Sequence, residues 1–493
     1  MKKAKILAVL IAALLTSVIS TPCINAFAIS SLKDFSIITK EPEYFPATNN
    51  LEVGLYWFDQ YNRVHNSNSP TPYFDKTKPT VIFVHGWAES ILKNAGLSDS
   101  FPNFQYQPYA DPTIDINVLK DWINKGYNVG IFNWKQLADE PIVECAEDKI
   151  WTSQHWVGLI PINMRWKKVT GYETKNMPNK TSADLFYESY SKAMEGYKGD
   201  DIRIVGHSLG NQMAIRLVDL VDKHIENGDI PKELMPDRVA LLDPYYSERS
   251  KSYLNGNTTA DEADKIVRRL IDKQKIVFEM YKSSALTNNN LSGDSNRALE
   301  KMCYHADLYP NYFLLMEQRE KHCLPIYTYF WQSLYKLNPN TAGIMSTEDN
   351  SSLGAMMGGA YYWYQKQGRY TINPQDDTYL PRKIGRYIPQ VDITLSYNGK
   401  NLTYVDKNNY ETINVNVGGY VSLNTQAYPL TATSKIVSFK KESGAMDSVQ
   451  IATNGIFKAL NPGQVLIKVY SRNLDRNGQL GEEIAKYVMI NVS

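Results

Sequence analysis

Along the first 390 residues or so, short apolar runs typical of strands alternate with stretches whose apolar residues have helical spacing. Short apolar runs occur at 51–58, 80–87, 129–134, 201–205, 238–242 and 276–281, of which 201–205 is rich in β-branched residues. Such runs are typical of the buried strands of a parallel sheet. Between them, apolar residues at helical spacing predict helices at 115–126, 185–197, 211–221 and 259–274, the last with a capping box at 259–262. This alternation predicts an α/β fold with a mainly parallel sheet.

From about residue 390 the pattern becomes one of short segments in which apolar and polar residues alternate. These segments are 413–417, 420–423, 435–439, 465–469 and 487–492, and turn residues separate them. The spacing predicts an all-β sandwich of about 100 residues. We expect a catalytic domain at 29–388, a second domain at 389–493, and a linker in the Pro- and Gly-containing stretch 380–386.

The first 28 residues have the composition of a signal peptide. Three lysines within the first five residues precede an apolar stretch at 6–19, and Ala-Phe-Ala at 26–28 fits a cleavage site. We therefore expect a secreted, extracellular protein. Cleavage would leave Cys145, Cys303 and Cys323, of which the last two are candidates for a disulfide.

The charge of the chain gives no indication of a nucleic-acid partner. The sequence contains 53 basic and 52 acidic residues, well mixed, for a net charge of +1. A nucleic-acid-binding protein would show a basic stripe or patch, as would a protein that binds an anionic membrane surface.

The run Gly-His-Ser-Leu-Gly at 206–210 is the strongest chemical motif. It lies between a predicted strand and a predicted helix, the context of a nucleophile elbow. The motif predicts Ser208 as the nucleophile, and the backbone amide of Leu209 as one donor to an oxyanion. A second donor is expected from Trp87, because His-Gly-Trp at 85–87 ends a strand.

A serine nucleophile needs a base and an acid that orients it, and in α/β-hydrolases both follow the serine in the chain. Asp243 is the best acid, because it ends a buried strand at the edge where ligand sites open; Asp307 and Asp294 are weaker alternatives.

Three histidines follow the serine. His224 lies about 24 Å along the predicted helix, at 1.5 Å per residue, and is excluded. His305 and His322 remain, and spacing does not choose between them.

Several stretches together resemble the animal pancreatic-type lipases over about residues 50–340. These are 80–87, 129–135, 206–210, Leu-Leu-Asp-Pro at 241–244 and Asp-Leu-Tyr-Pro-Asn at 307–311. The resemblance implies an α/β-hydrolase fold with Ser208, Asp243 and His322 as the catalytic triad. Tyr-Phe at 312–313 stands where that family has Gly-Gly, and its lid has no match; aromatic insertions at 90–110 and 140–180 are lid candidates.

The C-terminal segment resembles bacterial immunoglobulin-like domains of group 2 at 417–423 and 454–465. In exported bacterial proteins such domains are spacers or adhesive modules, so the resemblance implies a cell-wall or surface ligand.

The hypothesis from the sequence is a secreted serine hydrolase, a lipase that cleaves acylglycerol esters with transient contact to a lipid interface. A short-chain carboxylesterase and a phospholipase A1 are the alternatives within this class. A surface adhesion protein on an inactive hydrolase scaffold is the non-enzyme alternative. The mechanism calls for no metal and no organic cofactor.

Overall fold

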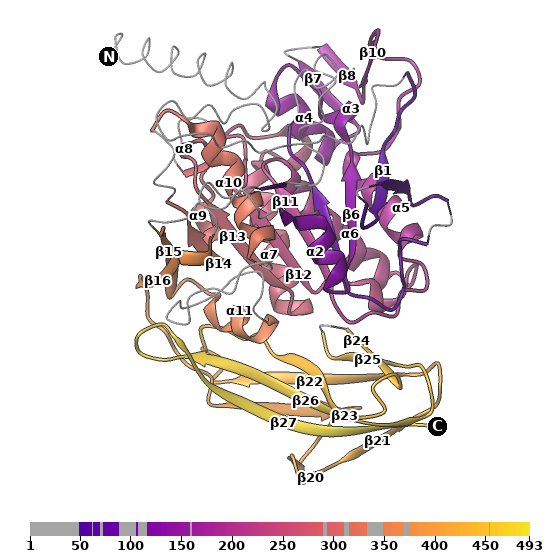
Figure 1. Ribbon diagram of the computed structural model, residues 1–493, viewed down its shortest axis with the longest axis vertical. Helices are drawn as coiled ribbons and strands as arrows, with labels where there is room; N and C mark the ends of the chain where they lie inside the picture. The colour runs from indigo at the N-terminus through magenta and orange to yellow at the C-terminus, as the bar shows by residue number, and fades with distance from the viewer. Residues whose placement is uncertain are drawn as a thin grey trace.

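The computed structural model describes residues 49–61, 63–69, 72–87, 105–106, 116–157, 160–288, 293–309, 315–332, 349–368, 374–452 and 454–493. The chain forms a large part that mixes helices and strands, followed by a smaller part made of strands (Figure 1). The helices within these residues include none with the length and apolarity needed to cross a membrane. The expected signal peptide lies outside the described residues.

One large sheet organises the first part. From edge to edge its described strands are β2 (Val64–Asn66), β1 (Gly54–Phe58), β6 (Asn128–Asn133), β3 (Thr80–Val84), β11 (Ile202–His207), β12 (Arg238–Leu242), β13 (Val277–Lys282), β14 (Tyr304–Asp307), β15 (Tyr361–Lys366) and β16 (Thr378–Lys383). Strands β6 to β15 run parallel. Strands β1 and β2 at one end of the sheet and β16 at the other end pair antiparallel with their neighbours. The predicted α/β fold with a mainly parallel sheet is confirmed.

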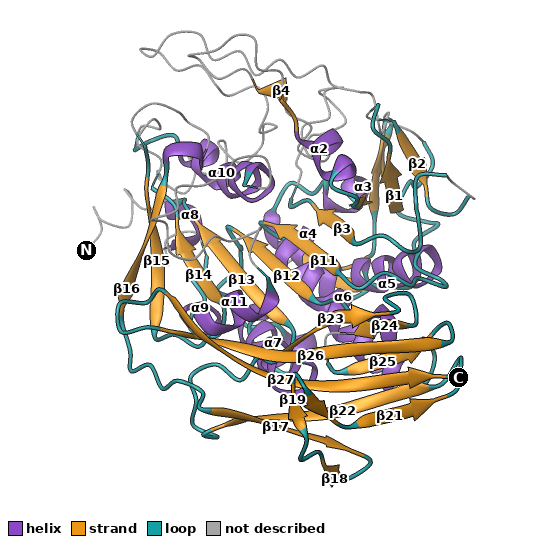
Figure 2. Ribbon diagram, turned by 60° about the horizontal axis from the view of Figure 1, so that its bottom comes forward, coloured by secondary structure: helices purple, strands orange, loops and turns teal. Residues whose placement is uncertain are grey.

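Helices cover both faces of this sheet (Figure 2). They are α2 (Val118–Asn124), α3 (Lys135–Ala138), α4 (Val143–Trp151), α5 (Ser182–Ala193), α6 (Gly210–Glu226), α7 (Thr259–Gln274), α8 (Ala285–Asn288), α9 (Arg297–Glu300), α10 (Gln318–Trp331) and α11 (Asn350–Met356), with short 3₁₀ turns at Lys232–Leu234, Ser252–Leu254 and Pro374–Asp376. Burial on both faces explains why β3 and β12 are buried along their whole length and apolar after their first residues, Thr80 and Arg238.

Two helices begin at capping boxes that were not predicted at these residues. Helix α7 is capped by Thr258 with Asp261, one residue before the predicted box, because the Thr259 hydroxyl instead donates to the buried Glu147 at 2.7 Å. Helix α5 begins three residues earlier than predicted, because Thr181 caps it and Asp184 completes the box. It ends at Ala193.

The smaller part consists of two main sheets that enclose a separate apolar core (Figure 2). One has the order β18 (Lys400–Asn401), β17 (Asp392–Tyr397), β22 (Tyr420–Tyr428), β25 (Ile456–Ala459) and β24 (Val449–Ala452); the other has β21 (Thr412–Val415), β27 (Leu480–Val492), β26 (Gly463–Leu474) and β23 (Ser438–Gly444). Pairing is antiparallel except between β21 and β27. The predicted all-β architecture of this segment is confirmed.

Four further two-stranded pairs complete the described strands. They are β4 (Gln105–Tyr106) with β5 (Ile116–Asn117), β7 (Gln154–Val157) with β8 (Ile160–Asn163), β9 (Trp166–Lys168) with β10 (Gly171–Glu173), and β19 (Val405–Asp406) with β20 (Asn409–Tyr410).

The stretch 380–386, expected to be a linker, instead contributes to an edge strand. Strand β16 pairs with β15 through Lys383, and Pro381 lies opposite Trp363. Proline is tolerated there because an edge strand has a free side where the missing N–H costs nothing.

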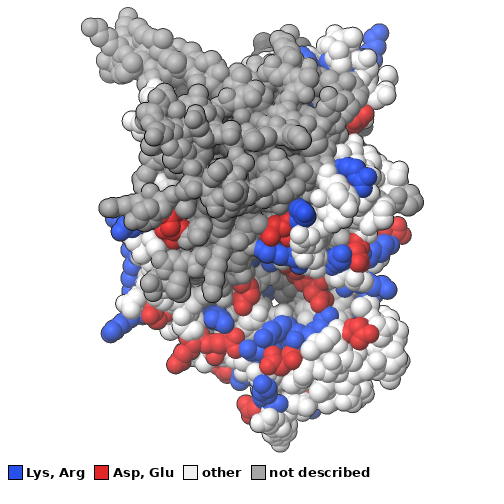
Figure 3. Space-filling view, in the orientation of Figure 1, with Lys and Arg blue, Asp and Glu red and all other residues white. Residues whose placement is uncertain are grey.

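The two parts meet where the parallel strands begin. The side chain of Gln450 donates to the Gly199 carbonyl at 2.9 Å, and the Ile451 amide donates to Asp200 at 2.9 Å. Lys441 forms an ion pair with Asp200 at 2.7 Å, and Lys458 forms one with Glu233. Acidic and basic side chains intermix along this junction (Figure 3), which also lines a pocket of about 400 Å³ that opens to solvent.

Candidate active site

Ser208 lies in the sharp turn between β11 and α6. Its backbone is left-handed, with a φ of 54°, a conformation that is strained for a residue with a side chain and is common at catalytic positions. The turn is held in place because the Ser208 amide donates to the carbonyl of Leu242, the last residue of β12, at 3.0 Å. The elbow that the motif predicts is therefore formed.

Glycines make room for this turn. A Cβ atom at Gly210 would lie 2.2 Å from the carbonyl oxygen of Val84, and one at Gly206 would lie 2.4 Å from that of Gly210. A Cβ at Gly86 would lie 2.6 Å from the Cβ of Ser208 and 3.2 Å from its Oγ. The loop after β3 therefore packs directly against the candidate nucleophile, which only glycine at position 86 permits.

Two backbone amides near Ser208 are available to an incoming acceptor. Among the described residues, neither the Trp87 N–H nor the Leu209 N–H donates a hydrogen bond to another group. The Trp87 side chain has a hydrogen bond of its own, since its indole Nε1 donates to the Glu140 carbonyl at 2.6 Å. Free amides beside a nucleophile are what an oxyanion hole requires.

His85, beside these amides, takes part in packing. Its ring is buried and stacks on Trp134 at a centroid distance of 5.7 Å. Burial, together with the nearby Lys135 charge, lowers the pKa of His85 to about 3. The His85 side chain is therefore a neutral group that packs the loop after β3.

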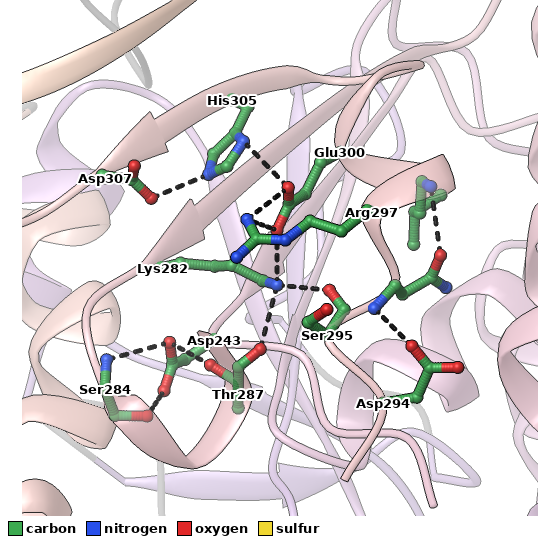
Figure 4. Close-up of polar contacts among 12 residues, drawn as sticks. Asp243, Lys282, Ser284, Thr287, Asp294, Ser295, Arg297, Glu300, His305 and Asp307 are labelled. Atoms are coloured by element: carbon green, nitrogen blue, oxygen red, sulfur yellow. Dashed lines mark hydrogen bonds and ion pairs between the residues drawn. The ribbon is translucent and has the colours of Figure 1, made fainter. Parts of the chain in front are cut away.

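Asp243 follows β12 and is fully buried. Its carboxylate accepts a hydrogen bond from the Ser283 amide at 2.9 Å. It also accepts from the Thr287 hydroxyl at 2.8 Å and from the Ser284 hydroxyl (Figure 4). Burial alone would raise the pKa of Asp243, but the bond and charge of His322, with these donors, hold that pKa below its ordinary value. Asp243 is thus a buried carboxylate.

His322, on helix α10, is the histidine that reaches this carboxylate. Its Nδ1 lies 2.5 Å from Oδ2 of Asp243, and its side chain is 13% exposed. Because a carboxylate only accepts, Nδ1 carries the proton and Nε2 is left as the basic nitrogen.

The other two histidines after Ser208 have different partners. His305 contacts Asp307 at 3.0 Å and Glu300 at 3.9 Å, away from Asp243 (Figure 4). His224 bonds Asp229 at 2.6 Å at the far end of α6. Of these three histidines, His322 is the one that contacts Asp243, a difference that the spacing of the sequence did not contain.

The ring of His322 lies next to the elbow. It is tilted against the ring of His207, the residue just before Ser208, with a centroid distance of 4.6 Å. Among the described residues no hydrogen bond joins Ser208 Oγ to His322. Such bonds are often long in enzymes without substrate and shorten when the substrate binds.

No family of proteins matches this chain by its family model, and no curated protein matches it. Solved structures match parts of it at low similarity. They include an uncharacterized protein from Bacillus cereus ATCC 10987, with 14% identity and a TM-score of 0.24 over 51% of this chain and 60% of that one. LpqC, a poly(3-hydroxybutyrate) depolymerase from Bordetella parapertussis, has 14% identity and a TM-score of 0.24 over 52% and 66%.

A thermostable esterase from Pseudomonas putida ECU1011 has 12% identity and a TM-score of 0.20 over 56% of this chain and 70% of that one. The chain spans less than two thirds of the length of the Bacillus and Bordetella proteins. Likeness at this level identifies no family.

The sequence reasoning missed the donors that hold Asp243. Ser283, Ser284 and Thr287 directly follow β13, the strand next to β12. A run of hydroxyl residues just after a buried parallel strand was the available signal, since such strand ends share one edge of the sheet.

The remaining sequence candidates lie elsewhere. Asp294 accepts from the Asn296 amide at 2.8 Å and does not contact His322. Trp151, a lid candidate, donates from its indole to Gln212 of α6 at 2.6 Å and so packs on the elbow helix. The lid candidates at 90–104 lie outside the described residues. Cys303 is a free, buried thiol, so the candidate disulfide with Cys323 is not formed.

Proposed function

We propose that the protein is a serine ester hydrolase with Ser208 as nucleophile, His322 as general base and Asp243 as the orienting acid. One observation carries this proposal: at the sheet edge that holds Ser208 in a left-handed turn, a buried carboxylate bonds Nδ1 of a histidine at 2.5 Å. This is the relation between acid and base that a catalytic triad needs.

The proposed ester hydrolysis uses Nε2 of His322, the Ser208 hydroxyl and two backbone amides. Nε2 of His322 takes the proton of Ser208 as Oγ forms a bond to the ester carbonyl carbon. The amides of Trp87 and Leu209 donate to the oxygen, which becomes negatively charged. His322 then gives its proton to the departing alkoxide, and the ester C–O bond breaks. Water attacks the acyl-enzyme by the same route and releases the carboxylic acid.

We further propose that the ester is an acylglycerol and that the protein acts as a lipase after export. The support is the set of lipase-like motifs together with two exposed apolar side chains just before helix α10. Leu315 is 78% exposed and Met316 is 81% exposed, close in sequence to His322. Exposed apolar residues beside a reactive site fit contact with a lipid surface better than with water.

Labelling with a fluorophosphonate probe tests the core of the proposal. The probe should attach to the wild-type protein, while Ser208→Ala should abolish labelling. His322→Ala should lose labelling and turnover, whereas His305→Ala should keep most of both. If the wild type is not labelled, the hydrolase proposal fails and the adhesion hypothesis is favoured.

The substrate class needs a separate assay. Rates on p-nitrophenyl esters of increasing chain length, on triacylglycerol emulsions and on phospholipid vesicles distinguish the alternatives. A lipase prefers long chains and emulsions. Preference for short soluble esters supports a carboxylesterase, and release of fatty acid from vesicles supports a phospholipase A1.

A further inference from the structure

Helix α10, which carries His322, contains a proline in its interior. Pro325 has no N–H, so the carbonyl of Lys321, four residues earlier, lacks its normal helical donor. An outside group supplies that bond, because the hydroxyl of Ser283 donates to the Lys321 carbonyl. The missing helical bond is thus replaced by a side chain from the loop after β13.

Ser283 also holds the acid. Its backbone amide donates to Oδ1 of Asp243 at 2.9 Å, while its hydroxyl bonds the carbonyl next to His322. A single residue therefore connects the carboxylate to the backbone of the turn that presents the imidazole. Each connection is one bond long, so a shift of this loop would move both groups.

The next carbonyl along α10 is also held from outside. Nε2 of His207 donates to the carbonyl of His322 at 2.9 Å, and His207 directly precedes Ser208. A carbonyl only accepts, so Nε2 of His207 carries the proton. Burial and the neighbouring His322 lower the pKa of His207 to about 3, so the ring stays neutral and keeps this tautomer.

We propose that Ser283 and His207 are positioning residues that fix the turn bearing His322 to the acid's loop and the nucleophile's strand. Pro325 leaves the Lys321 carbonyl open to the first of these contacts. This inference rests on the proposed function, since it assigns a role toward that same base. Pro325 does not simply leave the helix one hydrogen bond short, because the Ser283 hydroxyl replaces the donor that the proline lacks.

Single and double variants of Ser283 and Pro325 test this proposal. Ser283→Ala removes the outside donor, and we expect kcat on a p-nitrophenyl ester to fall about fivefold with KM unchanged, since a hydrogen bond contributes about 1 kcal/mol. Pro325→Ala restores an N–H within the helix. In the double variant Ser283→Ala with Pro325→Ala, kcat should return to within about twofold of the Pro325→Ala value.

Two further variants complete the design. His207→Phe keeps a ring beside His322 but removes its N–H, and it should also lower kcat without raising KM. Ser191→Ala is the matched control, because the Ser191 hydroxyl donates to the Glu188 carbonyl on the exposed side of α5. It should leave kcat unchanged. His207→Phe keeps the inference testable if Ser283→Ala does not fold.

The outcomes separate this inference from the proposed function. If the wild type neither hydrolyses esters nor reacts with the fluorophosphonate, the proposed function fails. The positioning role alone is overturned if the wild type is active but Ser283→Ala and His207→Phe keep its kcat. The same holds if adding Pro325→Ala to Ser283→Ala does not restore kcat.

Discussion

Lys282 is a fully buried cation whose loss should destabilise the large part of the protein. Its ammonium donates to the carbonyls of Thr287 and Ser295 at 3.0 and 2.5 Å, and to Glu300 at 2.7 Å (Figure 4). Lys282 thus holds the loop from which the Thr287 hydroxyl reaches Asp243. Lys282→Met removes all of these bonds while keeping a side chain of similar length.

The magnitude follows from the burial of the pair. Breaking a buried ion pair from one side costs about 3–5 kcal/mol, because a charge and polar groups remain without a partner. Here Glu300 keeps Arg297, at 2.8 and 2.9 Å, on its solvent side. We therefore expect a loss near the lower end, about 3 kcal/mol.

The assay is urea unfolding followed by tryptophan fluorescence. All nine tryptophans lie at or before residue 363, so the signal reports the large part alone. Lys223→Met is the matched control, since Lys223 pairs with Asp219 at 2.8 Å but is 53% exposed. It should cost less than about 1 kcal/mol. A Lys282→Met loss no larger than that of the control would refute this reasoning.

Three other changes have definite expected results. Asp243→Asn should lower kcat about 10⁴-fold with little change in KM, measured by ester hydrolysis, because His322 loses the acceptor that sets its tautomer. Gly86→Ala should lower kcat/KM at least about 10²-fold, because its Cβ would lie 2.6 Å from that of Ser208; unchanged kinetics would show that the loop has room. Burial raises the pKa of Asp377 to about 7. Folding therefore takes up a proton between about pH 4 and 7, and stability falls with rising pH there by up to about 1.4 kcal/mol per unit. Asp377→Asn should flatten this slope in urea titrations, and an unchanged slope would contradict it.

The sequence was informative wherever burial on both faces imposes an apolar run. Strands such as β3 and β12 have this pattern and were predicted close to their observed bounds. Strands β14 and β15 were missed, because they contain polar residues and β15 alternates buried with exposed positions. Strand β16 was taken as a linker, because proline usually marks a break rather than an edge strand.

The candidate site shows the same division. Ser208 and Asp243 could be predicted because each sits at the end of an apolar strand, where a local motif is enough. His322 could be selected only by resemblance, because it lies on a helix and its contact with Asp243 spans 79 positions of the chain. The donors Ser283 and Ser284 depend on the pairing of β12 with β13, which sequence spacing does not contain.

The junction between the two parts sets the orientation of the whole molecule. The smaller part bonds the loops where the parallel strands begin, through Gly199 and Asp200, whereas Ser208 and Asp243 lie where those strands end. The edge that holds Ser208 and Asp243 and the smaller part, which contains the C-terminus (Figure 1), therefore lie at opposite ends of the parallel strands. A protein immobilised on a resin through Ser493 would present the edge with Ser208 and Asp243 to the bulk liquid, accessible to droplets or particles too large to diffuse into a support.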